Sequence, residues 1–273
     1  MTPNWQTARA SDGAALPYNV VGEGPPLLLV PGLGNSSRLF GTLPRTLVRH
    51  GWKTILFDPR GLGRAKHEPR PWTFTNAIED IATILDDVGI EATHVLGTSM
   101  GGKLALALGA RYPGRVREAF LFGTESVGGA RPRAVYEMFR TVFTSEQPER
   151  IATVLLPFLF GRTFLERHER VVRDILRAYA PSAEERATTL RQVDALLERD
   201  YRSLLPSVKA RVTCHAGMED TLVDPADIEV TASLLPNGVF CEVPAAGHSM
   251  ILENPDVALA ELRTRARGPL RGP

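Results

Sequence analysis

Short apolar runs alternate with longer amphipathic segments along the first part of the chain. Each apolar run is bounded by Pro or Gly, which is typical of a buried strand. We expect strands at four such runs, PPLLLVPG (25–32), KTILFDPRG (53–61), THVLGTS (93–99) and VREAFLFGT (116–124). The segments between them predict helices at 35–51, 76–90 and 100–114. Because strand and helix alternate, the pattern predicts a mostly parallel sheet covered by helices on both faces.

The alternation stops between residues 125 and 206, where the chain reads as helix only and is rich in Arg and Glu. It returns afterwards, with strand, helix, strand and helix expected at 211–217, 225–235, 238–246 and from about Met250. We therefore expect one α/β core made of residues 1–124 and 207–273. The helical segment 125–206 is expected to pack as a cap over the edge of the sheet from which it leaves.

Composition and charge narrow the choice of partner. The 32 Lys and Arg residues nearly balance 31 Asp and Glu, for a net charge of +1. This balance gives no electrostatic case for a nucleic acid or an anionic membrane, so a small molecule is the expected partner. The first 26 residues lack the pattern of a signal peptide, and the histidines lack the paired spacing of a metal site. We expect a cytoplasmic chain without a metal or cofactor, in which Cys214 and Cys241 are free; the oligomeric state stays open.

The stretch HVLGTSMGGKL, residues 94–104, carries the clearest chemical signal. Gly97-Thr98-Ser99-Met100-Gly101 is a G-x-S-x-G sequence between an expected strand and an expected helix. In that context the turn is so tight that the serine adopts a strained backbone and presents its hydroxyl above the sheet edge. The pattern therefore predicts Ser99 as a nucleophile, which needs a base to become reactive.

An acid and a histidine follow in the order that this geometry requires. Asp220 comes just after the expected strand 211–217, and His248 comes just after the next strand. The predicted roles are attack by Ser99, proton transfer through His248 and orientation of the imidazole by Asp220. Two other acids stay open as the third member, Asp224 and Glu125, although Asp224 is also well placed to cap the following helix.

Two backbone N–H groups are predicted to stabilise an oxyanion, those of Met100 after the nucleophile and Leu33 in the loop PGLG. Gly32 and Gly34 on either side of Leu33 let the backbone approach a ligand. The uncharged run VLLPFLFG, residues 154–161, predicts an apolar pocket wall above Ser99. The residues expected to line the substrate pocket are Gly32, Gly34, Leu155, Phe158, Leu159, Phe160 and Met250.

The motifs together resemble the α/β-hydrolase fold superfamily, in particular its helical-capped members of the small bacterial esterase and enol-lactonase type. The resemblance covers nearly the whole chain and rests on PGLG, FDPRGLGRA, GTSMGG, AGMEDTLVDP and AGHSMILENP, in that order. Many relatives have His-Gly before the oxyanion loop, whereas this chain has Pro31-Gly32. That departure bears on the shape of the oxyanion hole and leaves its backbone donors in place.

The resemblance and the three candidate catalytic residues predict a serine hydrolase. It would cleave an ester, lactone or thioester of a small, mainly apolar molecule through an acyl-enzyme on Ser99. A fold does not settle a reaction, so three alternatives stay open. They are a lyase or cyclase that tailors a secondary metabolite, for example by eliminating an acyloxy group, a C–C bond hydrolase, and a small-molecule receptor that retains the triad.

Overall fold

The computed structural model describes residues 4–145 and 147–265 and contains a central eight-stranded sheet. The strands follow the order β1-β2-β4-β3-β5-β6-β7-β8. β2 runs antiparallel to both of its neighbours, β1 and β4. The strands β4, β3, β5, β6, β7 and β8 all run parallel to one another. Their bounds are Trp5–Arg9, Ala15–Val21, Pro26–Val30, Lys53–Phe57, Thr93–Thr98, Val116–Phe122, Arg211–Gly217 and Gly238–Val243 for β1 to β8. The predicted fold class, a mostly parallel sheet flanked by helices, is confirmed.

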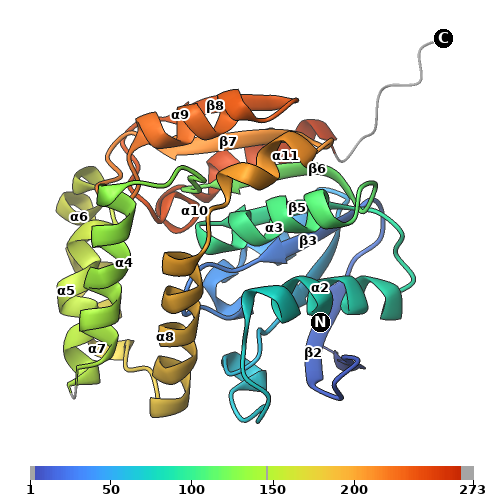
Figure 1. The fold of residues 1–273 in the computed structure, drawn as a ribbon. Helices are drawn as coiled ribbons and strands as arrows, with labels where there is room; N and C mark the ends of the chain where they lie inside the picture. The colour runs from blue at the N-terminus through green and yellow to red at the C-terminus, as the bar shows by residue number, and fades with distance from the viewer. Residues whose placement is uncertain (1–3, 146, 266–273) are drawn as a thin grey trace.

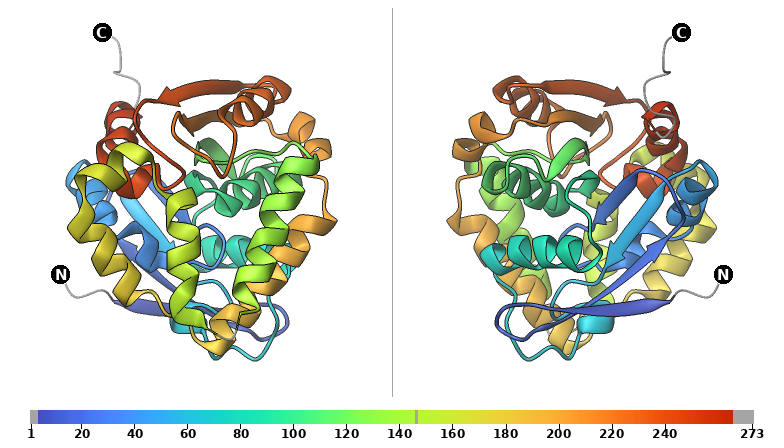
Figure 2. Two further views of the ribbon diagram at one scale, coloured as in Figure 1. Left: turned by 90° about the vertical axis from the view of Figure 1, so that its left-hand side faces the viewer. Right: turned by 90° about the vertical axis from the view of Figure 1, so that its right-hand side faces the viewer.

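Helices cover both faces of the sheet, as the two further views in Figure 2 show. One face packs against α2 (Phe74–Asp87), α3 (Met100–Arg111) and α9 (Pro225–Leu234), and the other against α1 (Leu43–Arg49), α10 (Met250–Glu253) and α11 (Pro255–Arg265). Strand β3 shows why both faces need cover. Leu28 and Val30 belong to the first core and Leu27 and Leu29 to the second, because alternate side chains of a strand point to opposite faces.

The chain between β6 and β7 forms only helices in the part that the structure describes. They are α4 (Ala130–Phe143), α5 (Ile151–Leu159), α6 (Arg162–Arg167), α7 (Glu169–Ala178) and α8 (Ala183–Glu198). Figure 1 shows them standing together beside one end of the sheet. Their shared core includes Phe139 and Phe143 of α4, Leu155 of α5 and Val193 of α8. We call α4 to α8 the helical roof, because they cover the cavity described below.

Several short 3-10 helices complete the described chain. They are η1 (Ser37–Phe40), η2 (Gly63–Ala65), η3 (Pro148–Arg150) and η4 (Arg202–Ser207). The helix predicted at 35–51 is in fact η1 followed by α1, because Gly41 interrupts it at a φ of 48°. The predicted final helix is likewise divided, into α10 and α11, at Asn254 before Pro255.

Two further findings bear on the sequence predictions. No helix in the described ranges is long and apolar enough to cross a membrane; the cytoplasmic location stays a prediction. Both cysteines are free, with Cys214 buried and Cys241 half-buried on the neighbouring strands β7 and β8.

Candidate active site

Ser99 stands in the sharp turn between β5 and α3, and its backbone is strained as the motif predicts. Its φ is 51° and its ψ −119°, a conformation that a residue with a Cβ rarely adopts. The Ser99 N–H donates to the Phe122 carbonyl of β6 at 2.8 Å, which holds the turn against the sheet. Gly101 is required because a Cβ there would lie 2.2 Å from the Val30 carbonyl oxygen. The helix therefore starts almost in contact with β3, and the serine is fixed above the strand ends.

Asp220 and His248 meet in the loops that follow β7 and β8. Nδ1 of His248 lies 2.8 Å from Oδ2 of Asp220, whose side chain is fully buried. The other carboxylate oxygen accepts hydrogen bonds from the Leu222 and Val223 N–H groups at 2.8 and 2.9 Å. These bonds hold the carboxylate in one orientation, and its charge places the proton of a neutral imidazole on Nδ1. The second ring nitrogen is then free to accept a proton.

The two other candidate acids are engaged elsewhere. Asp224 is the N-cap of α9, where its side chain accepts a hydrogen bond from the Ala226 N–H at 3.0 Å. Glu125 is buried and forms an ion pair with Lys103, with 2.9 Å between Oε1 and Nζ. The geometry therefore favours Asp220 as the partner of His248.

Gly123, just after β6, is a site residue that the sequence interpretation missed. Its φ is 62°, and a Cβ at this position would lie 3.0 Å from Nδ1 of His248. Its N–H donates to the carbonyl of His215 at 3.0 Å, which ties it to β7. The imidazole of His248 thus packs directly against the backbone of Gly123, which has no side chain. A glycine near the end of the predicted strand 116–124 was the available signal.

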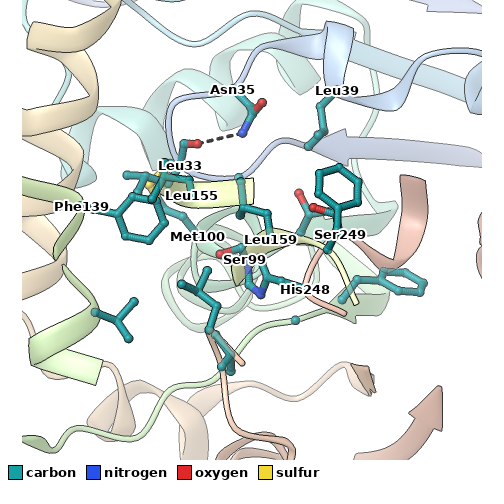
Figure 3. A pocket seen from close by; sticks show the side chains of 18 of the residues that line it. Leu33, Asn35, Leu39, Ser99, Met100, Phe139, Leu155, Leu159, His248 and Ser249 are labelled. Atoms are coloured by element: carbon teal, nitrogen blue, oxygen red, sulfur yellow. Dashed lines mark hydrogen bonds between the residues drawn. The ribbon is translucent and has the colours of Figure 1, made fainter. Parts of the chain in front are cut away.

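The loop after β3 brings Leu33 beside Met100, and both line the same cavity as Ser99 (Figure 3). In the described part of the chain, neither backbone N–H donates a hydrogen bond to protein, so both are available to a ligand oxygen. The loop is braced by Asn35, whose Nδ2 donates to the Leu33 carbonyl at 2.8 Å. It is also braced from the roof, because the Gly34 N–H donates to Oε1 of Gln192 in α8 at 2.8 Å. Nothing local in the sequence marks Gln192, which meets the loop only in the folded chain.

Ser99 and His248 line one cavity of about 250 Å³ between the sheet and the helical roof. Most of its wall is apolar, and Figure 3 shows Leu155, Leu159 and Phe139 of the roof above the serine. The predicted pocket residues Gly32, Leu155, Leu159 and Phe160 line this cavity. The remaining apolar lining comes from Leu33, Leu39, Phe122, Pro132, Val135, Phe143, Ala152, Leu156, Ile175, Leu196, Leu222, Val223, Ile251 and Leu252.

Three predicted pocket residues lie outside that lining. Phe158 is 37% exposed, because α5 turns its other face, with Leu155, Leu156 and Leu159, toward the cavity. Met250 is fully buried in the core beneath α10, so its neighbours contribute to the cavity instead. Gly34 has a φ of 66° and faces Thr189 and Gln192 of the roof rather than the cavity. These three expectations were wrong.

One corner of the cavity is polar. Lys103 and Glu125 form their ion pair there, and the Tyr136 hydroxyl donates to Oε1 of Glu125 at 3.0 Å. Burial lowers the pKa of Lys103, while the neighbouring Glu125 opposes that effect. Burial and the charge of Glu125 both raise the pKa of Tyr136, so it remains a neutral donor. The signal for this corner was a lysine on an otherwise apolar helix, four residues after Ser99.

Comparison with known proteins agrees with this architecture. The sequence model of the family described as alpha/beta hydrolase fold matches residues 25–255. Among curated proteins, the chain is 26% identical over 248 residues to "Putative carbamate hydrolase RutD" of Azorhizobium caulinodans, covering 89% of this chain and 92% of that protein.

Solved structures with the same fold include two enzymes. One is a thermophilic esterase from Thermogutta terrifontis, with a TM-score of 0.84 and 24% identity, covering 97% of this chain and 98% of the other. Another is the enol-lactonase from Burkholderia xenovorans, with a TM-score of 0.82 and 23% identity, covering 95% of this chain and 100% of the other. At these identities the likeness shows the fold.

Proposed function

Because the chain belongs to the α/β-hydrolase fold family and is a hydrolase, we propose that it cleaves an ester, lactone or thioester through an acyl-enzyme on Ser99. The substrate would be a small, mainly apolar molecule. One observation carries this proposal: His248, bonded to the buried carboxylate of Asp220, lines the same apolar cavity as the strained Ser99.

The acylation step follows from the positions of these groups. The Ser99 hydroxyl attacks the carbonyl carbon of the substrate while the free nitrogen of His248 takes its proton. The negative oxygen that forms is stabilised by the N–H groups of Leu33 and Met100. Asp220 stabilises the charged imidazole and keeps its orientation. The leaving alcohol, thiol or ring oxygen departs with the proton from His248.

Deacylation repeats the same steps with water. His248 accepts a proton from the water molecule, whose oxygen attacks the acyl carbon on Ser99. The acid is released when the proton returns to the serine oxygen. Apart from the water, both half-reactions use groups of this chain, held on four loops at the carboxyl ends of β3, β5, β7 and β8.

The relatives named as carbamate hydrolases suggest one extension of the substrate class. A carbamate presents the same kind of electrophilic carbonyl carbon as an ester, so the same centre is able to attack it. The shape and polarity of the cavity, rather than the triad, would then decide which acyl compound is turned over.

The test is turnover of p-nitrophenyl esters of rising acyl length, with one p-nitrophenyl carbamate, by the native enzyme and by Ser99→Ala. Sustained turnover that is lost in Ser99→Ala supports the proposal, and the best acyl length measures the cavity. A burst that stops after one equivalent points to the receptor alternative. A natural substrate converted to an unsaturated product without solvent oxygen would establish a lyase. A carbonyl substrate cleaved while simple esters are ignored would establish C–C hydrolysis.

A further inference from the structure

The polar corner of the cavity is made of side chains that the proposed reaction does not use. Lys103, Glu125 and Tyr136 all line the cavity of Ser99 and also a second cavity of about 130 Å³ behind it. They therefore stand at the wall between the two spaces. Lys103 and Glu125 are each about 95% buried, which is rare for charged side chains unless they are paired.

This corner lies within reach of a molecule bound at Ser99. Lys103 follows Ser99 by one turn of α3, about 6 Å along the helix axis. Glu125 is anchored from the other side, because the hydroxyl of the preceding Thr124 donates to the Ser99 carbonyl at 2.9 Å. An acyl group attached to Ser99 thus has the apolar roof on one side and this corner near its far end.

The two oxygens of the Glu125 carboxylate accept different numbers of hydrogen bonds. Oε1 of Glu125 accepts from both the Lys103 ammonium and the Tyr136 hydroxyl, at 2.9 and 3.0 Å. Lys103 also donates to the Glu125 carbonyl and lies 5.0 Å from the centre of the Tyr201 ring, so its donors are engaged. Among the residues that the structure describes, none donates to Oε2 of Glu125. The free acceptor of the corner is therefore this carboxylate oxygen.

The charged groups around the corner extend beyond the pair of Lys103 and Glu125. Asp227 also lines the cavity, and Arg131 lies 4.0 Å from it and 3.6 Å from Asp224, so Arg131 is shared between two carboxylates. A substrate carboxylate would meet Glu125 and Asp227 at close range, and a substrate cation bound to Glu125 would lie close to the Lys103 ammonium. A neutral group that donates one hydrogen bond fits this arrangement best.

On the basis of the proposed function, we propose that Glu125 is a specificity-determining residue. It selects substrates whose acyl part ends, beyond an apolar body, in a neutral hydroxyl or N–H donor that bonds to its Oε2. Lys103 and Tyr136 act as positioning residues that hold the carboxylate in place. The favoured substrate is thus an apolar acyl compound with one polar end, such as a phenol or a terminal alcohol.

The test compares ligands that differ in one group. p-Nitrophenyl esters of para-hydroxy and para-methyl phenylacetic and 3-phenylpropanoic acids form pairs of nearly equal size. Their Kd values are measured by calorimetry with the Ser99→Ala protein, so that the result does not depend on turnover. We expect the hydroxyl member of at least one pair to bind about tenfold more tightly, as for a hydrogen bond to a buried charged acceptor.

Variants assign that preference to Glu125. In Glu125→Gln on the Ser99→Ala background the ratio should fall to about one or two. Because loss of one charge can harm folding, the double variant Lys103→Met with Glu125→Leu removes both charges and should also abolish the preference. Glu118→Gln is the matched control, since Glu118 is a buried carboxylate on β6, the strand that leads to Glu125, and it is paired with Arg211 and Arg265. It should keep the ratio.

The possible results distinguish a failure of the proposal for Glu125 from a failure of the proposed hydrolase function. If no pair shows a preference, or if the preference survives both variants at Glu125, the inference is overturned. If the native enzyme hydrolyses the esters but shows no such preference, the proposed function is supported and the role of Glu125 in selectivity is rejected. If the preference is present but the native enzyme turns over none of these esters, the role of Glu125 in binding is supported and the proposed hydrolysis of such esters is rejected.

Discussion

The floor and the helical roof of the cavity are built in different ways. The floor carries Ser99, Asp220 and His248 on loops at the ends of parallel strands, and backbone hydrogen bonds hold those loops. The roof is a set of helices joined mainly through apolar side chains such as Phe139 and Val193. Backbone bonding fixes positions more closely than side-chain packing, which tolerates exchange of one apolar residue for another. In the proposed reaction the chemistry is thus carried by the part that backbone hydrogen bonds hold, and the apolar roof, which sequence change alters more easily, sets the space for the acyl group.

The floor should be most sensitive at Asp220. Asp220→Asn keeps the size of the side chain but favours the wrong tautomer of His248, so kcat should fall about 10⁴-fold. The melting temperature should change little by comparison. The measurement is kcat for the best ester together with thermal unfolding.

Asp224→Asn serves as the control, because Asp224 caps α9 and Asn is an equally good cap, while its other contact is an exposed ion pair with Arg131 at 3.6 Å. It should retain nearly all activity. Near-normal turnover of Asp220→Asn would instead move the role of the acid to another carboxylate.

Gly123 tests how precisely the floor holds the imidazole. Gly123→Ala would place a methyl group 3.0 Å from Nδ1 of His248 and should lower kcat about 100-fold by displacing the ring. Gly114→Ala is the matched control, since Gly114 also has a positive φ, of 95°, but open space around a Cβ. If both variants lose the same activity, general backbone strain rather than contact with His248 explains the loss.

Gln192 tests the hydrogen bond that links α8 of the roof to the oxyanion loop of the floor. Gln192→Met removes the acceptor of the Gly34 N–H, so the oxyanion loop loses a brace and kcat should fall about tenfold. Gln192→Glu keeps an acceptor oxygen and should restore much of kcat even where the buried charge lowers stability. A loss that appears only in KM, or equal losses in both variants, would show that the link does not position the loop.

The smallest effects are expected from apolar changes in α5. Leu155→Ala enlarges the cavity and should shift the best acyl length upward by one to two carbons, at a stability cost of about 2–5 kcal/mol. Phe158→Ala, three residues away, should leave the acyl-length profile unchanged because Phe158 lies outside the lining. The check is the ester series repeated with both variants, and a shift in Phe158→Ala would contradict the assigned face of α5.

The contrast between floor and roof also explains what the sequence reveals. The floor residues Ser99, Asp220 and His248 each lie within a few residues of the end of a short apolar run, so local pattern was enough to predict that they meet at one edge of the sheet. The strands β1 and β2 were missed because they lie toward an edge of the sheet and are only partly buried, so they lack a continuous apolar run.

Roof residues were harder to predict for a physical reason. Phe158 lies in an almost wholly apolar run, so composition could not tell which side of α5 faces the cavity. Gln192 has its role only because α8 returns to a loop about 158 residues earlier in the chain. Lys103 is different, because a charged residue on a helix that is apolar on most sides is visible in the sequence, although nothing local marks Glu125 as its partner.

The hydrogen bond between Gly34 and Gln192 has a consequence for evolution and for recombination of such enzymes. Exchanging the inserted helices between homologues is an obvious way to change substrate range, since they enter and leave the core at β6 and β7. A transplanted insert that lacks an acceptor at this point would leave the loop of the recipient with an unpaired donor. Ancestral changes in the two segments are therefore expected to have occurred in matched pairs, and chimeras should be designed with the loop and α8 taken from the same parent.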